Sequence, residues 1–209
     1  MNSEFLDKIM TTPDLLQMGH GQTIEDKNLG MGWIYYSLSR LYKPEVVVCI
    51  GSWRGFVPML IAKGMKDNLN GGRLIFIDPS MVDDFWSDES AVDRYFKDWE
   101  LDNITHYKMT TQEFKSSDVY KNLEKIDILF VDGLHTYEQA KFDHETFLPL
   151  LNSKSITLFH DSVMTHESNI YGDDNKYTYS VNRYMSELKD SGYQVLDLPF
   201  EFGLSLVRN

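Results

Sequence analysis

The chain has 209 residues, of which 42% are hydrophobic and 25% are charged, a composition typical of a folded globular protein. Its net charge of −12 disfavours nucleic acid and anionic membranes as partners, because such a surface repels phosphate groups. The sequence contains no apolar run near the roughly 20 residues needed to span a bilayer, and it begins without the pattern of a signal peptide. The single cysteine, Cys49, excludes an internal disulfide and a cysteine-rich metal site, so a cytoplasmic location is the default expectation.

The hydrophobic pattern predicts helices and strands in alternation. Residues 1–30 are expected to form an N-terminal extension of helix and loop, followed by one domain over residues 31–209. In chain order, the predicted elements of that domain are helix 31–42, strand 46–50, helix 56–65, strand 73–77, helix 90–101, strand 104–109, strand 126–131, helix 137–151, strand 155–159 and helix 178–190. This alternation indicates an α/β fold in which helices cover both faces of a parallel sheet.

The end of the chain departs from this alternation. Residues 193–196 and 204–207 both have the pattern of a strand, and the link between them is too short for a crossover helix. These two strands should therefore pair antiparallel. The sequence predicts a Rossmann-like sheet of seven strands, mostly parallel, with the last strand reversed.

The turn after strand 46–50 has the sequence G-S-W-R-G at residues 51–55. The strand itself is apolar on both faces, as expected for a strand buried in a parallel sheet. Glycines allow a tight turn and a close approach of the backbone to a ligand. The helix that follows directs its free N–H groups to the same place, so this turn predicts a site for a nucleotide-type ligand.

Polar side chains also follow three later strands, namely Asp78, Asp132 and the pair His160-Asp161. In open α/β sheets a ligand binds at the carboxyl ends of the strands, at the point where the strand order reverses. We therefore expect these residues to face the same crevice as the glycine turn.

Asp78 lies 23 residues beyond Gly55. A carboxylate about 20 residues after the glycine turn can accept hydrogen bonds from both ribose hydroxyls of a bound nucleoside. The alternative is that Asp78 caps a helix that begins at Pro79.

Asp132, His160 and Asp161 supply two carboxylates and one imidazole, a set that suits Mg²⁺ or Mn²⁺, and His160 also permits Fe²⁺. The alternative, which the sequence leaves equally open, is that these acids cap helices or orient a positively charged ligand.

His135 follows Asp132 by three residues and is a candidate general base, since an unperturbed histidine has a pKa of about 6.5. A lone histidine in a loop is otherwise a surface residue.

These motifs together resemble the class I S-adenosylmethionine (SAM)-dependent methyltransferases. The turn C-I-G-S-W-R-G resembles their first motif, Asp78 in F-I-D-P resembles their ribose-binding acid, and the reversed last strand is similar to that of their seven-stranded sheet. Residues 126–162, with F-V-D-G-L-H-T-Y-E-Q-A-K-F-D and L-F-H-D-S, resemble more narrowly the methyltransferase family 24 group, related to catechol and macrolide-sugar O-methyltransferases. The resemblance covers roughly residues 30–209.

The resemblance implies SAM as the methyl donor. The cofactor-binding residues that it implies are Gly51, Ser52, Trp53, Gly55, Asp78, Thr110, Thr111 and Asp132. In metal-dependent relatives, the positions of Asp132, His160 and Asp161 hold Mg²⁺, which lowers the pKa of the acceptor hydroxyl. The implied catalytic residues are then Asp132 and His135, with His135 as the proton acceptor.

One position departs from the family pattern. Members of the fold commonly carry an acid two residues before the first glycine, facing the amino group of SAM, and this chain has Cys49 there. A thiol cannot supply that charge-assisted hydrogen bond, which is worth about 1.5–3 kcal/mol. Either another group holds the amine, or SAM binding is weak or altered.

The expected function is therefore O-methylation of a small hydroxylated molecule, such as a sugar or a natural-product intermediate, with help from a divalent metal. One alternative is a metal-binding protein of the same fold that catalyses another reaction, such as hydroxylation, or that catalyses no reaction. A dinucleotide-dependent oxidoreductase fits poorly, because the turn lacks the pattern G-x-G-x-x-G.

Residues 164–179 are expected to form either an acceptor-binding lid or a surface loop. The polar and aromatic candidates in that segment are His166, Glu167, Asn169, Tyr171, Asp173 and Asp174. The oligomeric state stays open, with a homodimer as one alternative.

Overall fold

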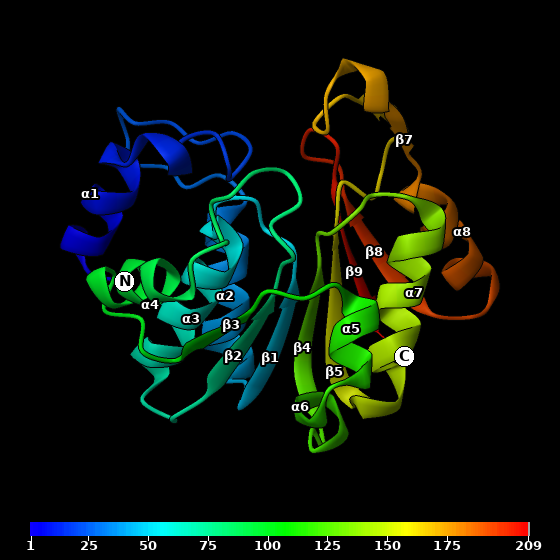
Figure 1. The fold of residues 1–209 in the computed structure, drawn as a ribbon, viewed down its shortest axis with the longest axis horizontal. Coiled ribbons are helices and arrows are strands. Elements are labelled where there is room, and N and C mark those ends of the chain that lie inside the picture. The colour runs from blue at the N-terminus through cyan, green and yellow to red at the C-terminus, as the bar shows by residue number, and fades with distance from the viewer. Residues whose placement is uncertain (209) are drawn as a thin grey trace.

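A seven-stranded sheet forms the centre of the protein in the computed structural model, which describes residues 1–208 (Figure 1). Its strands are β1 (Val46–Ile50), β2 (Arg73–Ile77), β3 (Ile104–Tyr107), β4 (Ile126–Val131), β5 (Leu151–His160), β8 (Gln194–Leu198) and β9 (Leu204–Arg208). The order across the sheet is β3-β2-β1-β4-β5-β9-β8. Neighbours from β3 to β5 are parallel, whereas β9 runs antiparallel to both β5 and β8. The predicted mostly parallel sheet with a reversed last strand is confirmed.

The strand order reverses between β1 and β4. The chain runs outward from β1 to β2 and β3, and then returns to place β4 on the other side of β1. The crossovers on the two sides of this point lie on opposite faces of the sheet, so a crevice opens at the carboxyl ends of β1 and β4. The fold therefore places its ligand-binding edge at the turn that carries the glycine motif.

Alternate residues of the strands build a separate apolar core on each face of the sheet. Val47 and Cys49 of β1 pack into one core, and Val48 and Ile50 pack into the other. The first core is covered by α1 (Ser3–Thr11), α2 (Gly32–Tyr42), α3 (Phe56–Asn68) and α4 (Glu89–Asp98). The second core is covered by α5 (Thr111–Ser116), α7 (Tyr137–Phe147) and α8 (Val181–Asp190), with the short α6 (Asp118–Lys121) beside α5. Figure 1 shows these two groups of helices on opposite sides of the sheet.

The first thirty residues pack against the domain. Helix α1 and the 3₁₀ turn Pro13–Leu15 bury Phe5, Ile9 and Leu15 in the same core as α3. This packing holds the loop that connects α1 to α2 above the carboxyl edge of the sheet (Figure 1). No helix within residues 1–208 is both long enough and apolar enough to cross a membrane.

Several predicted boundaries differ from the structure. The predicted helix 178–190 begins only at Val181, because β7 (Tyr177–Tyr179) pairs with β6 (His166–Ser168) in an antiparallel hairpin. The predicted helix 137–151 ends at Phe147, since Leu148–Leu150 contains a proline and forms a 3₁₀ turn before β5. Another 3₁₀ turn, Asp173–Asn175, lies between β6 and β7.

Helix α5 was absent from the predicted elements, although its start has a clear local cause. Thr110 and Glu113 form a capping box, in which the Thr110 hydroxyl accepts from the backbone N–H of Glu113 and the Glu113 carboxylate accepts from that of Thr110. This cap begins α5 at the carboxyl edge of the sheet, directly after β3. The predicted strand 104–109 accordingly ends earlier, at Tyr107.

Candidate active site

A cavity of about 750 Å³ opens at the carboxyl edge of the sheet. The residues singled out by the sequence that line it are Gly51, Ser52, Trp53, Asp78, Thr110, Thr111, Asp132, His135, His160 and Asp161. Residues at the ends of five different strands, β1 to β5, therefore converge on one space, as the fold rule requires. Gly55 is not among the described residues that line the cavity; a Cβ there would lie 2.9 Å from the ring of Trp86, so this glycine allows close packing.

The glycine turn brings the ends of β1 and β4 into backbone contact. Gly51 has a φ of 70°, and a Cβ at this position would lie 2.2 Å from the carbonyl oxygen of Asp132. Only glycine can adopt this positive φ and also leave room for the carbonyl oxygen of Asp132. Its N–H donates to the carbonyl of Ile77 at 2.8 Å, so the turn is tied to β2 as well.

Asp78 is largely buried at the end of β2. Burial raises the pKa of Asp78 to about 6, although the backbone N–H groups of Ser80 and Ser52 stabilise its charged form. Ser80 N donates to Asp78 Oδ1 at 2.7 Å. The alternative role as a helix cap does not hold, because the next helix begins at Glu89 with Asp88 as its N-cap.

The ends of β4 and β5 bring two acids and two histidines together. The closest contact joins His160 Nδ1 to Asp132 Oδ1 at 2.9 Å, and the same nitrogen lies 3.3 Å from Asp161 Oδ1. His135 faces both carboxylates, with Nε2 3.6 Å from Asp132 and Nδ1 3.8 Å from Asp161. All four side chains are largely shielded from solvent. The candidate base and the candidate metal ligands thus form one cluster.

The charges in this cluster are strongly interdependent. Burial alone would lower the pKa of His160, but the carboxylates of Asp132 and Asp161 raise it to about 9. Burial would raise the pKa of Asp132, but the imidazoles of His160 and His135 hold it below its usual value. For His135 burial dominates and lowers the pKa, so this imidazole is neutral at neutral pH.

The same cluster fits a divalent cation. Within the described chain, His160 Nδ1 and Asp161 Oδ1 are buried without a hydrogen bond of good geometry. Asp161 also adopts a φ of 49°, a left-handed conformation that costs a non-glycine residue of order 1 kcal/mol and is typical of functional sites. Buried carboxylate oxygens and an imidazole nitrogen that face one point are suitable ligands for Mg²⁺, Mn²⁺ or Fe²⁺.

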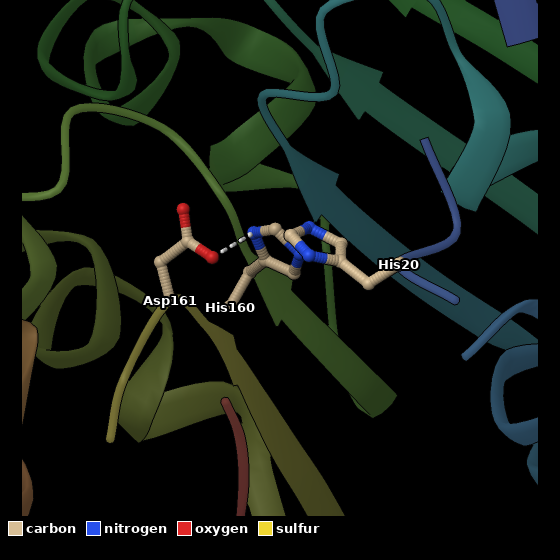
Figure 2. A group of neighbouring side chains, drawn as sticks. All are labelled: His20, His160 and Asp161. Atoms are coloured by element: carbon tan, nitrogen blue, oxygen red, sulfur yellow. Dashed lines mark ion pairs between the residues drawn. The ribbon is translucent and has the colours of Figure 1, made fainter. Parts of the chain in front are cut away.

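Sequence reasoning missed His20, which the N-terminal segment brings to this cluster. Figure 2 shows its ring beside that of His160, and the two ring centroids lie 4.8 Å apart. The sequence gives no signal of where the His20 side chain lies in space, because this residue is a lone histidine in a polar loop and is far along the chain from every strand. Only the packing of residues 1–30 on the domain reveals it.

The segment 164–179 lines the cavity with aromatic side chains, whereas its acidic side chains do not line the cavity. His166, Tyr171, Tyr177 and Tyr179 line the cavity, and His166 stacks on Phe202 with centroids 3.9 Å apart. The remaining polar candidates, Glu167, Asn169, Asp173 and Asp174, are exposed. The hairpin β6–β7 therefore covers the side of the cavity next to His135.

Another buried acid, Asp143, lines the cavity beside Thr111. Asp143 of α7 is 1% exposed and accepts a hydrogen bond from Gln139 Nε2 at 2.7 Å. Burial raises the pKa of Asp143 to about 6. The sequence signal that could have identified it is the i, i+4 spacing of Gln139 and Asp143 on one helix face.

Cys49 is buried in the core on the α3 side of the sheet, and its thiol lies 3.5 Å from the carbonyl oxygen of Gly51. Burial raises the pKa of this thiol, so it remains uncharged. The main chain of Asp132 packs directly against Gly51, and its carboxylate lies near enough to Cys49 to help raise the pKa of the thiol.

Comparison with known proteins gives a consistent result. A family model described as a methyltransferase domain matches residues 48–162, which is more than half of the chain. The uncharacterized protein y4gI of Sinorhizobium fredii is 30% identical over 82 residues, which is 39% of this chain; the match spans only 8% of that relative's length.

Three solved methyltransferase structures have a similar fold. The O-methyltransferase from Bacillus cereus in complex with SAH has a TM-score of 0.66 and 14% identity, covering 100% of this chain and 92% of that chain. The SAH-bound methyltransferase PaMTH1 of Podospora anserina has a TM-score of 0.65 and 17% identity, covering 98% and 86%. The O-methyltransferase TomG of Streptomyces achromogenes, in complex with SAM and involved in tomaymycin synthesis, has a TM-score of 0.64 and 14% identity, covering 100% and 90%.

Proposed function

The chain belongs to the methyltransferase family whose model matches residues 48–162, and from that premise we propose that it methylates a hydroxyl oxygen of a small, uncharged molecule with SAM as the donor and with the help of a divalent cation. The convergence of the glycine turn, Asp78 and the Asp132 cluster on one cavity carries this proposal. Similar folds crystallised with SAH or SAM support the choice of donor.

The donor would occupy the side of the cavity formed by β1 and β2. The backbone of Gly51 and Ser52 would contact its methionine portion, and the Asp78 carboxylate would accept from its ribose hydroxyls. Thr110 and Thr111, at the start of α5, would lie near the adenine. Asp132 is the carboxylate next to the glycine turn, and it would take over the role of the acid that Cys49 replaces.

The acceptor would lie against the cluster at the ends of β4 and β5. Asp132, His160 and Asp161 would hold a divalent cation, which when bound lowers the pKa of an acceptor hydroxyl. His135 would accept the hydroxyl proton, since its neutral imidazole faces the same space. Methyl transfer would form the bond between the acceptor oxygen and the methyl carbon and break the bond from that carbon to the sulfur of SAM, giving a methyl ether and SAH.

The residues that line the acceptor side of the cavity favour an acceptor molecule with an uncharged ring. Among the described residues that line the cavity, Arg54 is the sole lysine or arginine, and it pairs with Asp83 at 2.7 Å. Apart from the proposed cation and the His160 imidazole, a phosphorylated or otherwise anionic acceptor would find only this paired arginine as a cationic partner there. Tyr171, Tyr177 and Tyr179 offer flat apolar faces and hydroxyls, which suit a sugar ring or an aromatic natural-product intermediate.

Calorimetric titration with SAM, SAH and NAD tests the proposal. We expect saturable binding of SAM and SAH, and an Asp78→Ala variant should bind both at least tenfold more weakly while remaining folded. An Asp84→Ala variant, which changes an exposed acid outside the cavity wall, is the matched control. Saturable binding of NAD without binding of SAM or SAH would overturn the donor assignment.

A further inference from the structure

His20 reaches the cluster from a segment that is remote in the sequence. One imidazole nitrogen of His20, one of His160 and a carboxylate oxygen of Asp161 all lie within 4.8 Å of one another. The His20 side chain is 15% exposed, so it is largely withdrawn from solvent. Figure 2 shows it approaching from the side opposite the strand that carries His160 and Asp161.

The tautomer of His20 is determined by a second carboxylate. Its Nδ1 lies 2.5 Å from Glu201 Oε2, in the loop between β8 and β9. With Nδ1 as the donor to Glu201, the lone pair of Nε2 is free. A carboxylate that accepts from the second nitrogen of an imidazole is the usual partner of a metal-binding histidine, because it fixes the ring and increases its basicity.

The loop that carries His20 is built to hold one conformation. His20 has a φ of 44°, and a Cβ on Gly30 would lie 2.1 Å from its carbonyl oxygen. Met31 N donates to the carbonyl of Gly19 at 2.7 Å, so the two ends of the loop are joined next to His20. A strained residue held by close backbone contacts indicates a positioned side chain.

We propose that His20 is a ligand of the divalent cation, positioned by Glu201, and that the set His20, His160 and Asp161 makes this site select a first-row transition metal over Mg²⁺. The inference rests on the metal-assisted function proposed above and names the class of metal. Mg²⁺ prefers oxygen ligands, whereas imidazole nitrogens suit Fe²⁺, Co²⁺, Zn²⁺ and related ions. Two imidazoles and one carboxylate within 4.8 Å of one another match the ligand types of mononuclear Fe²⁺ sites, and Asp132 beside His160 adds a second carboxylate.

The test is direct metal binding to the chelator-treated full chain. Calorimetry with Co²⁺, Mn²⁺ and Mg²⁺ gives the affinities, and the visible absorption of bound Co²⁺ reports imidazole ligands independently of activity. We expect Co²⁺ to bind at least tenfold more tightly than Mg²⁺. His20→Ala should weaken Co²⁺ binding by roughly 10–100-fold and change the Co²⁺ spectrum, with Mg²⁺ binding changed less than about threefold.

Two further variants keep the test decisive if His20→Ala does not fold. Glu201 is 53% exposed, so Glu201→Gln should fold, and we expect it to weaken Co²⁺ binding by about tenfold. Glu25→Ala changes an exposed acid in the same segment and should leave Co²⁺ binding unchanged.

The outcomes separate this inference from the function on which it rests. If Asp161→Asn abolishes Co²⁺ binding while the His20 and Glu201 variants retain it within threefold, the cation site stands and His20 is not a ligand. Equal or tighter binding of Mg²⁺ to the wild type would overturn the selectivity. If no metal binds to the wild type, the inference and the metal assistance both fail, whereas titration with SAH still reports the methyl-donor site.

Discussion

His135 and Tyr179 stack face to face, with ring centroids 4.3 Å apart and planes only 8° from parallel. Tyr179 belongs to β7, so the hairpin that covers the cavity also fixes the candidate base. The backbone adds to this support, since Ser180 N donates to the carbonyl of His135 at 2.8 Å. The orientation of the imidazole therefore depends on a segment that follows it by more than forty residues.

Removing the ring of Tyr179 should impair turnover without affecting the donor site. In Tyr179→Leu the imidazole of His135 loses its stacking partner, and we expect kcat to fall by about tenfold, because a base must be held in the right geometry. Tyr179→Phe keeps the ring and should stay within threefold of the wild type. SAH formation with an acceptor found by screening gives kcat, and calorimetry gives the SAH affinity. Equal kcat values for the Leu and Phe variants would contradict this role.

His135→Ala should lose at least ~100-fold in turnover and keep its affinity for SAH. The imidazole lies beside the carboxylates of Asp132 and Asp161, whereas Asp78 is the residue proposed to bind the ribose of the donor. The measurement is the rate of SAH formation together with the calorimetric affinity for SAH. His106→Ala, which removes a partly buried histidine of β3, provides a comparison outside the cluster. Unchanged turnover in His135→Ala would reject this residue as the base.

The affinity for SAH should decrease as the pH falls through about 6. In the proposed donor site a charged Asp78 would accept from both ribose hydroxyls, whereas the protonated carboxyl would lose part of that accepting capacity. Burial raises the pKa of Asp78 to about 6. Between pH 7.5 and pH 5 we expect roughly a tenfold loss of affinity. Asp78→Asn should bind SAH weakly at both pH values and show a much flatter profile. A wild-type affinity that does not change over this range would exclude Asp78 from ribose binding.

Gly51→Ala should be much more harmful than Gly71→Ala. The two glycines have nearly the same φ, 70° and 71°, so the cost of a left-handed alanine is common to both. The Cβ at Gly51 meets the carbonyl of Asp132 at 2.2 Å, while the Cβ at Gly71 has open space. We expect Gly51→Ala to lose about 2 kcal/mol more of the free energy of unfolding, measured by urea denaturation, and to bind SAH more weakly. Similar losses in the two variants would show that the β1–β4 contact is not rigid.

The sequence was sufficient for the parts of the site that follow a local rule. Each polar motif directly follows a strand, and a parallel sheet brings the ends of its strands to one edge, so Asp78 and Asp132 could be assigned to the same cavity. His20 and Glu201 could not be assigned in this way, because loops carry them and only tertiary packing sets their positions. The hairpin β6–β7 was also missed, since each of its strands has only three residues, too few for a clear alternation of apolar residues.

A buried histidine outside the cavity gives the protein a stability that depends on pH. Burial lowers the pKa of His144 to about 4, and its Nδ1 lies 2.8 Å from the Tyr184 hydroxyl. The unfolded chain binds a proton with a pKa near 6.5, so the folded state binds fewer protons between pH 6.5 and 4, and stability falls as the pH decreases through that window. At pH 5 this group should account for a loss of about 2 kcal/mol relative to pH 7.5. In His144→Gln that part of the pH dependence should vanish, whereas Tyr184→Phe, which retains the imidazole, should keep it. Urea unfolding at the two pH values measures the difference, and an identical pH dependence in wild type and His144→Gln would show that another group is responsible.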